Sequence, residues 1–366
     1  MHFRLSLATA AMGALLALTG PAVPAKAQEI DYAALNAAIV DNYVIPRYAV
    51  FAERTTALQA SLEESCADGR LVVGESAAAY HDAMDAWMDV QHLRFGPAML
   101  FLRYDRLEFW PDKRGVVRRH LAQLLAAQDP QALETQTFAN GSVAVQGFPA
   151  LERLMFDSED SVWETPFGCQ LVVAIGGNLH AIAAGLLADW QDGETPYAKV
   201  VKGAAGGNET YFDAKEAALE FAKALRGALL LIDDYKLGRP LGDEAAAART
   251  SRAESWRSGR SLRNILHNLT AAQHLYEGTG DVSFAALLRA QPKGAELDAA
   301  ISGALARLVA AIEAQPDSLV TALEAPDGWA ELDAVRVETG QLMGLLSGPL
   351  SEVLDLPIGF NSYDGD

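Results

Sequence analysis

One short motif in the sequence places two possible metal ligands within a single helical turn. His274 and Glu277, in QHLYEG, form the only HxxE pair in the chain, and residues three apart on a helix share a face. A metal site needs three or four ligands, however, and this pair lies where a helix runs into the turn signal EGTGD. We therefore expect a polar helix end here rather than a metal site.

A second candidate is the carboxylate of Glu152, in the run SVAVQGFPALERLMF. Gly147 forms a turn in this run, and Pro149 suits the first turn of a helix, where its missing N–H costs nothing. The neighbours of Glu152 are apolar, and an unpaired carboxylate is costly to bury there. We expect Glu152 to pair with an internal arginine such as Arg94 or with the helix start; contact with a bound cation is the alternative.

A third group of polar residues lies in WMDVQHLRFGP, where Asp89 precedes His92 by one turn and Arg94 follows it. These side chains either point together into a pocket or form the end of an amphipathic helix that stops at Gly96 and Pro97. Both interpretations stay open from the residues alone. The sequence contains no serine hydrolase elbow, zincin motif, dinucleotide fingerprint or phosphate loop.

The elements that must position these groups are helices. Apolar residues recur at steps of three and four over 171–190 and 297–312, whereas sustained period-two alternation is nearly absent. The spacing predicts an all-α fold. The glycine-rich segment 202–210 divides the long helical segments into two sets, which predicts two tandem helical bundles over 28–200 and 201–366.

The first 27 residues have the layout of a secretory signal peptide, with Arg4 before an apolar run and small residues at the end. We expect cleavage before about Gln28 and a periplasmic mature protein without a membrane insertion. The chain is acidic, with 48 acidic and 29 basic residues and a formal net charge of −19. This charge argues against nucleic acid as a partner.

The two cysteines, Cys66 and Cys169, both lie in the predicted mature chain. An exported protein meets an oxidising compartment in which such a pair can close. We expect a Cys66–Cys169 disulfide; two buried free thiols are the alternative.

Several stretches together resemble the imelysin family of exported bacterial proteins. They are SVAVQGFPALERLMF, AWMDVQHLRFGP with FWPDKRG, CQLVVAIGGNLHAIAAGLLADW, KLGRPLG, ESWRSGRSLRNILHNL and the terminal GFNSYDGD. The resemblance implies two similar helical bundles, an association with iron uptake and a formal classification with metallopeptidases. Its hallmark is GxHxxE, whose histidine and glutamate are thought to contribute to a metal site near the junction of the bundles. Gly147 and Glu152 match this motif, whereas Pro149 replaces the histidine.

We expect a non-catalytic component of iron or metal acquisition that binds a cation or small ligand between the bundles. Glu152 is the one expected metal contact, and the cofactor would be iron or another divalent cation. If the missing histidine abolishes the metal site, the pocket could instead hold a small anionic or organic ligand, with Arg94, Lys236 and Arg239 as possible contacts. Besides Gly147 and Glu152, we expect the pocket to contain Pro149, His92, Arg94, Lys236 and Arg239.

Two other functions remain possible from the sequence. One is a metallopeptidase of the imelysin class, which needs at least three metal ligands and a general base. The other is a non-catalytic interaction module that docks an envelope or iron-transport protein. It differs from the first expectation because it needs no small ligand or metal.

Overall fold

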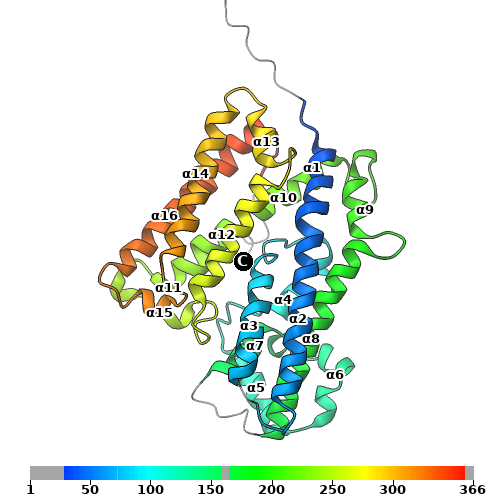
Figure 1. Ribbon diagram of the computed structural model, residues 1–366, viewed down its shortest axis with the longest axis vertical. Helices are drawn as coiled ribbons and strands as arrows, with labels where there is room; N and C mark the ends of the chain where they lie inside the picture. Colours follow the sequence, from blue (N-terminus) through cyan, green and yellow to red (C-terminus); the bar gives the residue numbers. More distant parts are fainter. Residues whose placement is uncertain (1–28, 72, 158–164, 359–366) are drawn as a thin grey trace, which may run out of the picture.

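The computed structural model describes residues 29–71, 73–157 and 165–358, and every regular element within these ranges is helical (Figure 1). The expected all-α fold is therefore confirmed. The short SVAV run forms a 3-10 turn, η4 (Val143–Val145), and not a strand. The predicted signal peptide and the terminal GFNSYDGD lie outside the described residues.

The first group of helices is built around α8 (Pro166–Gln191), which packs along α2 (Ile45–Ser65). Helix α3 (Val73–Met88) packs on α2, and α7 (Phe148–Phe156) packs on both α8 and α3. The predicted apolar stripe of α8 is buried, which confirms it: Leu171, Ile175, Leu179, Ile182, Leu186 and Trp190. The smaller helices of this group are α4 (Arg103–Leu107), α5 (Val116–Ala127), α6 (Thr135–Ala139) and α9 (Tyr197–Lys202).

Helix α8 is also the one helix in the described ranges whose length and composition would suit a membrane span. Half of its most apolar stretch is buried inside the protein. A helix at the centre of a bundle has the same composition because both faces of it meet other helices. The packing of α8 against α2 and α7 accounts for the buried half of this apolar stretch.

The second group contains α10 (Ala214–Leu230), α12 (Ser261–Glu277), α14 (Gly294–Glu313) and α16 (Gly328–Leu345), which pack on one another. The predicted stripe of α14 is confirmed, with Leu297 half-buried and the rest buried: Ile301, Leu305, Leu308 and Ile312. The short helices here are α11 (Arg239–Leu241), α13 (Phe284–Arg289), α15 (Leu319–Ala322) and α17 (Ser351–Val353). Helix α10 continues through the π-helical segment η7 (Leu231–Gly238) into α11.

Two helix pairs make the largest contacts between the groups. Helix α1 (Tyr32–Ile39) continues through the π-helical segment η1 (Val40–Val44) into α2 as one rod, and its α1 part packs on α10 (Figure 1). Helix α3 packs on α12. One continuous apolar core spans both groups. The predicted division at residue 200 stays a prediction, since α1 and α3 are shared with the second group.

The predicted disulfide is confirmed between Cys66, at the end of α2, and Cys169, in the first turn of α8. Their Cα atoms lie 5.6 Å apart. The bond ties one end of the α2 and α8 pair together. It lies within the first helical group.

Candidate functional site

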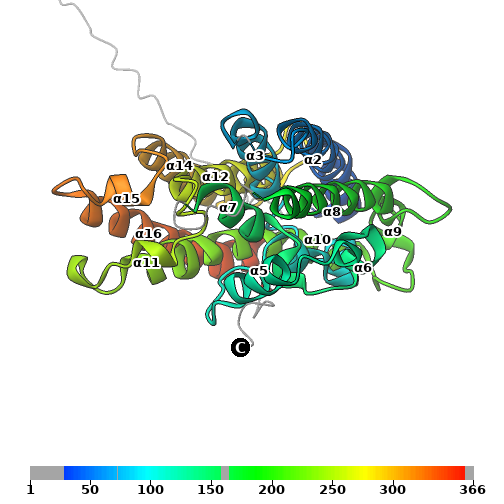
Figure 2. The same cartoon turned by 90° about the horizontal axis from the view of Figure 1, so that it is seen from below.

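A cleft with a volume of about 690 Å³ lies where the two helical groups meet. The first group lines it with residues of the segment 108–118 and with the first turns of α7. The second group lines it with 238–242 and 251–257. Viewed from below, α7 lies between the two groups (Figure 2). We call this hollow the junction cleft.

The start of α7 brings the GFPALE segment to this cleft. Gly147 is the N-cap of α7, and Pro149 follows within its first turn, so the predicted helix start is confirmed. A Cβ atom on Gly147 would lie 2.2 Å from the carbonyl oxygen of Leu107, which explains why this position has no side chain. Pro149 and Glu152 both line the junction cleft. The position at which the family has histidine therefore faces this cleft.

Glu152 is held by the backbone of the opposite wall. Its Oε1 atom accepts hydrogen bonds from the amides of Arg257 at 3.0 Å and Ser258 at 2.9 Å, and from the Ser258 hydroxyl at 2.9 Å. The hydrogen bonds to Oε1 come from a segment 105 residues away, whereas the sequence led us to expect an internal arginine such as Arg94 or the helix start. Burial raises the pKa of Glu152, although the bonds from Ser258 and the charge of Arg257 oppose that rise.

The donor atoms at the motif do not fit a bare metal ion. Proline has no side-chain donor atom, and Oε1 of Glu152 already accepts three hydrogen bonds. Over the ranges 29–71, 73–157 and 165–358, the side chains of His, Cys, Asp and Glu form no group of three that could hold a metal. A protein-held metal site usually needs three or four such ligands.

A buried ion pair forms part of the joint between the two groups. The Nζ atom of Lys236 lies 2.6 Å from Oε2 of Glu254, and it also donates to the sulfur of Met88 on α3 at 3.2 Å. Gln91 and Asn264 donate to the same carboxylate at 3.1 and 2.6 Å. Burial lowers the pKa of Lys236, against the opposing effect of Glu254. This network lies at the contact of α3 with the second group.

Glu108 connects this network with the junction cleft. It lines the cleft, is 3% exposed, and accepts a hydrogen bond from Nε1 of Trp87 at 3.2 Å. Burial raises the pKa of Glu108 well above its usual range, and the nearby carboxylates of Glu254 and Glu152 add to this effect, while Lys236 opposes it. Residues 108–113 also form a wall of a second hollow of about 410 Å³, which contains Arg94.

The structure therefore gathers only part of the predicted pocket. Pro149, Glu152 and Arg239 line the junction cleft. Arg94 lines the neighbouring hollow, with its guanidinium 4.5 Å from the centre of the Tyr104 ring. Lys236 is buried in the network described above.

His92 is not among the residues that line either hollow. Its Nε2 atom lies 2.8 Å from the Tyr43 hydroxyl, which donates to the carbonyl of Ala271 at 2.8 Å. The hydroxyl proton is used in that bond, so Nε2 carries the ring proton and donates. Burial lowers the pKa of His92 to about 3, together with the charge of Arg47. His92 thus serves the contact of the first helical group with α12.

The HxxE pair forms a polar helix end, as expected. His274 lies in the last turn of α12, which Gly278 terminates, and its Nδ1 atom faces Nη2 of Arg47 at 2.9 Å. Glu277 accepts a hydrogen bond from Gln273. The two side chains have separate partners.

The sequence interpretation missed most of the cleft lining. One part of the lining is the segment FWPDKRG with the residue before it, which contributes Trp110 and Glu108. The other part is the segment around ESWRSGR, which contributes Arg252, Trp256 and Arg257. Both segments contain arginine and tryptophan beside turn residues, and this composition is the one sequence feature that could have marked them as part of a binding site. Only the fold shows that these segments face each other.

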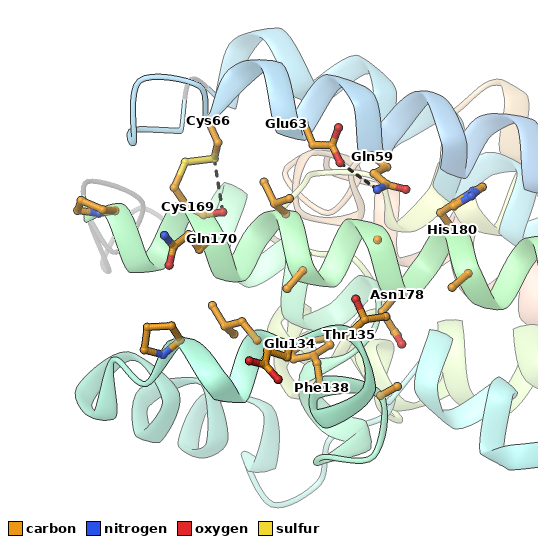
Figure 3. A pocket seen from close by; sticks show the side chains of 18 of the residues that line it. Gln59, Glu63, Cys66, Glu134, Thr135, Phe138, Cys169, Gln170, Asn178 and His180 are labelled. Atoms are coloured by element: carbon orange, nitrogen blue, oxygen red, sulfur yellow. Dashed lines mark hydrogen bonds between the residues drawn. A yellow bond between two sulfur atoms is a disulfide. The ribbon is translucent and has the colours of Figure 1, made fainter.

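A larger hollow of about 940 Å³ lies beside the disulfide, between α2, α6 and α8 (Figure 3). Two acids line it, Glu63 and Glu134. Glu63 accepts a hydrogen bond from Gln59 at 2.9 Å, and Asn178 accepts one from Arg106 at 2.7 Å. It is lined by the first helical group alone and contains none of the motif positions. We take the smaller junction cleft as the site because both groups and the motif converge there.

Comparisons with known proteins agree with this architecture. The family model described as Imelysin matches residues 44–341. A crystal structure of an imelysin-like protein from Psychrobacter arcticum 273-4 covers 92% of this chain and 100% of its own, at 19% identity and a TM-score of 0.75. A second crystal structure is that of a protein from Parabacteroides distasonis ATCC 8503, provisionally named iron-regulated protein A precursor. The match covers 87% of this chain and 95% of the Parabacteroides chain, at 16% identity and a TM-score of 0.73.

These structural likenesses show the fold, while the family model covers most of the chain. A comparison with curated proteins finds no significant match. The family's motif positions lie on α7 at the junction cleft, with proline at the histidine position. The chain belongs to the imelysin family.

Proposed function

We propose that the protein is an exported, non-catalytic binding component of iron or other metal acquisition, with its ligand in the junction cleft. The observation that carries this proposal is the convergence of both helical groups on the motif positions Pro149 and Glu152. A volume of about 690 Å³ is in the usual range for small-molecule sites. The iron-related name of the Parabacteroides protein supports the same direction.

A binding role agrees better with the site than hydrolysis does. A metallopeptidase holds its metal with at least three protein ligands and keeps one position open for water. The described residues provide no such group, and Glu152 is occupied by N–H and O–H donors. In this proposal the metal is cargo and arrives with ligands of its own.

The experiment uses tag-free protein released from the periplasm. The mature N-terminus is sequenced, and the protein is titrated by calorimetry with ferrous, ferric, zinc and calcium ions and with ferric citrate. We expect cleavage near Gln28 and saturable binding of at least one iron form. Absence of binding to every form would refute the acquisition role, and metal-dependent cleavage of a protein substrate would favour the peptidase.

One observation favours the interaction module as a second candidate. Four consecutive apolar residues, Met99 to Leu102, are exposed, and Phe101 is 75% exposed. Phe101 and Leu102 both have φ of 55°, an uncommon conformation for side chains of this size. Exposed apolar patches mark interaction sites. If this second function holds, replacing Phe101 and Leu102 by serine should abolish binding of the protein partner. The calorimetric titrations with metal ions and ferric citrate should be unchanged.

A further inference from the structure

The charge of the junction cleft is opposite to that of the whole chain. The chain carries 48 acidic against 29 basic residues. Three acids line the cleft, namely Glu108, Asp112 and Glu152, beside a larger set of bases. The bases are Lys113, Arg118, Arg153, Arg239, Arg252 and Arg257.

The acids of the cleft are bonded to the protein's own donors. Asp112 accepts hydrogen bonds from the amides of Val116 at 2.8 Å and Val117 at 2.9 Å, at the start of α5. Glu152 accepts hydrogen bonds from the amides of residues 257 and 258, and Glu108 accepts one from the indole N–H of Trp87. These carboxyl groups thus use acceptor oxygens on donors of the protein itself, which leaves fewer of them to bind a cation in the cleft.

The bases are much less compensated. The side chains of Lys113, Arg118 and Arg252 are exposed and make no hydrogen bond or ion pair within the described part of the chain. Arg239 is stacked 3.7 Å from the centre of the Tyr235 ring and reaches Asp234 at only 3.4 Å. The open face of the cleft is therefore positive.

Two further arginines share one carboxylate. Arg153 and Arg257 each lie 3.0 Å from Oδ2 of Asp157, and Arg257 also stacks on Trp256 at 4.3 Å. These contacts fix the two guanidinium groups in place at the edge of the cleft. Guanidinium groups bind carboxylate and phosphate oxygens through paired, charge-assisted hydrogen bonds.

We propose that the junction cleft binds a small multivalent anion whose charge is carried by carboxylate or phosphate oxygens, either free or chelating a metal ion. This inference rests on the proposed function, since it specifies the chemical form in which the cargo enters. A bare cation meets an excess of positive charge at the opening. An anion supplies the counter-charge that Arg118 and Arg252 do not have within the described part of the chain.

The test compares two double variants with the same change of net charge. Arg118→Gln/Arg252→Gln removes two bases of the cleft. The control, Arg119→Gln/Arg249→Gln, removes one arginine close in sequence to Arg118 and one close to Arg252. Neither of these two arginines lines the cleft. Arg119 is exposed and without a side-chain partner in the described ranges, and Arg249 bonds only nearby carbonyl groups. Because all four positions are exposed, we expect both proteins to fold.

Binding of citrate, inorganic phosphate and ferric citrate is measured by calorimetry at two salt concentrations. We expect the cleft variant to lose about tenfold or more in affinity, because hydrogen bonds to charged groups are lost. The control should change by about twofold or less, as expected for exposed charges, and wild-type binding should weaken with salt. Binding of citrate or phosphate alone identifies a free anion, whereas binding of ferric citrate alone identifies a chelate.

The outcomes separate the two proposals. If the wild type binds a bare metal ion and the cleft variant binds it equally well, the anion inference is wrong and the acquisition role stands. Equal losses in the two double variants, or binding of the anions that does not respond to salt, also overturn the inference. If neither the metals nor the anions bind, the proposed function fails as well.

Discussion

Lys236 and Glu254 form an ion pair with an Nζ to Oε2 distance of 2.6 Å, and each side chain is 2% exposed or less. The Nζ atom also contacts Met88 of the first helical group. Two formal charges are thus buried at the joint beside the junction cleft. Such a pair depends on both members, because a lone buried charge has no solvent to stabilise it.

Lys236→Met should lower the free energy of unfolding by about 3–5 kcal/mol, since it leaves the Glu254 carboxylate buried without its cation. Lys236→Met/Glu254→Gln should recover part of this loss, because the uncompensated charge is gone. Urea denaturation measures both variants. Arg307→Met, which removes an exposed pair with Glu338, is the control and should cost about 1 kcal/mol or less. Equal costs for Lys236→Met and Arg307→Met would contradict the prediction.

Glu108→Gln should stabilise the protein more at pH 8 than at pH 4. The folded protein raises the pKa of Glu108 well above its ordinary value of 4.5, chiefly through burial. A carboxyl group of this kind contributes stability below pH 4.5, and that contribution is lost as the pH rises toward the folded-state pKa. Glutamine stays neutral and can still accept the Trp87 N–H. Unfolding free energies of both proteins at several pH values provide the measurement, and a gap that does not change with pH would refute the prediction.

Gly147→Ala should destabilise the protein by about 1–3 kcal/mol, the usual cost of overpacking. The added Cβ atom would lie 2.2 Å from the carbonyl oxygen of Leu107, and backbone must move to admit it. Gly344→Ala is the matched control, because Gly344 lies in α16 and its Cβ atom would have no neighbour within 4 Å. We expect this control to gain about 0.5–1 kcal/mol from helix propensity. Thermal or urea unfolding of the two variants should therefore shift in opposite directions.

Replacing Cys66 and Cys169 by serine should reduce the free energy of unfolding by about 2–5 kcal/mol, because the bond closes a long loop in the unfolded chain. The sequence separation is 103 residues. Anion binding in the junction cleft should persist at temperatures where the variant is folded, since the bond lies in the first helical group. Unreduced wild-type protein should have a mass two hydrogens below that of the dithiol form, and alkylation of two free thiols would disprove the bond in solution.

The helices were predictable because their signal is local. The stripe from Leu171 to Trp190 on α8 follows from burial at a period of 3.6 residues, which the sequence displays directly. The start of α7 follows from Pro149 and the glycine before it. Each of these features depends on residues within a few positions of one another.

The site was less predictable because its contacts are distant in sequence. Glu152 is bonded by backbone amides of Arg257 and Ser258, and an amide has no sequence signature. The positive lining of the cleft is hidden in a chain with an overall charge of −19, since its bases come from separate segments. His92 shows the reverse case: its neighbours Asp89 and Arg94 suggested a pocket, but the fold places its ring against Tyr43.

The rod formed by α1, η1 and α2 has a mechanical consequence for the junction cleft. Its α1 part packs on α10, which continues into the cleft wall at α11, while its α2 part packs on α8, which supports α7 on the other wall. One continuous helical rod thus contacts the helices that lead to both walls. We expect the opening to keep nearly the same width with and without cargo, so that loading needs no hinge closure.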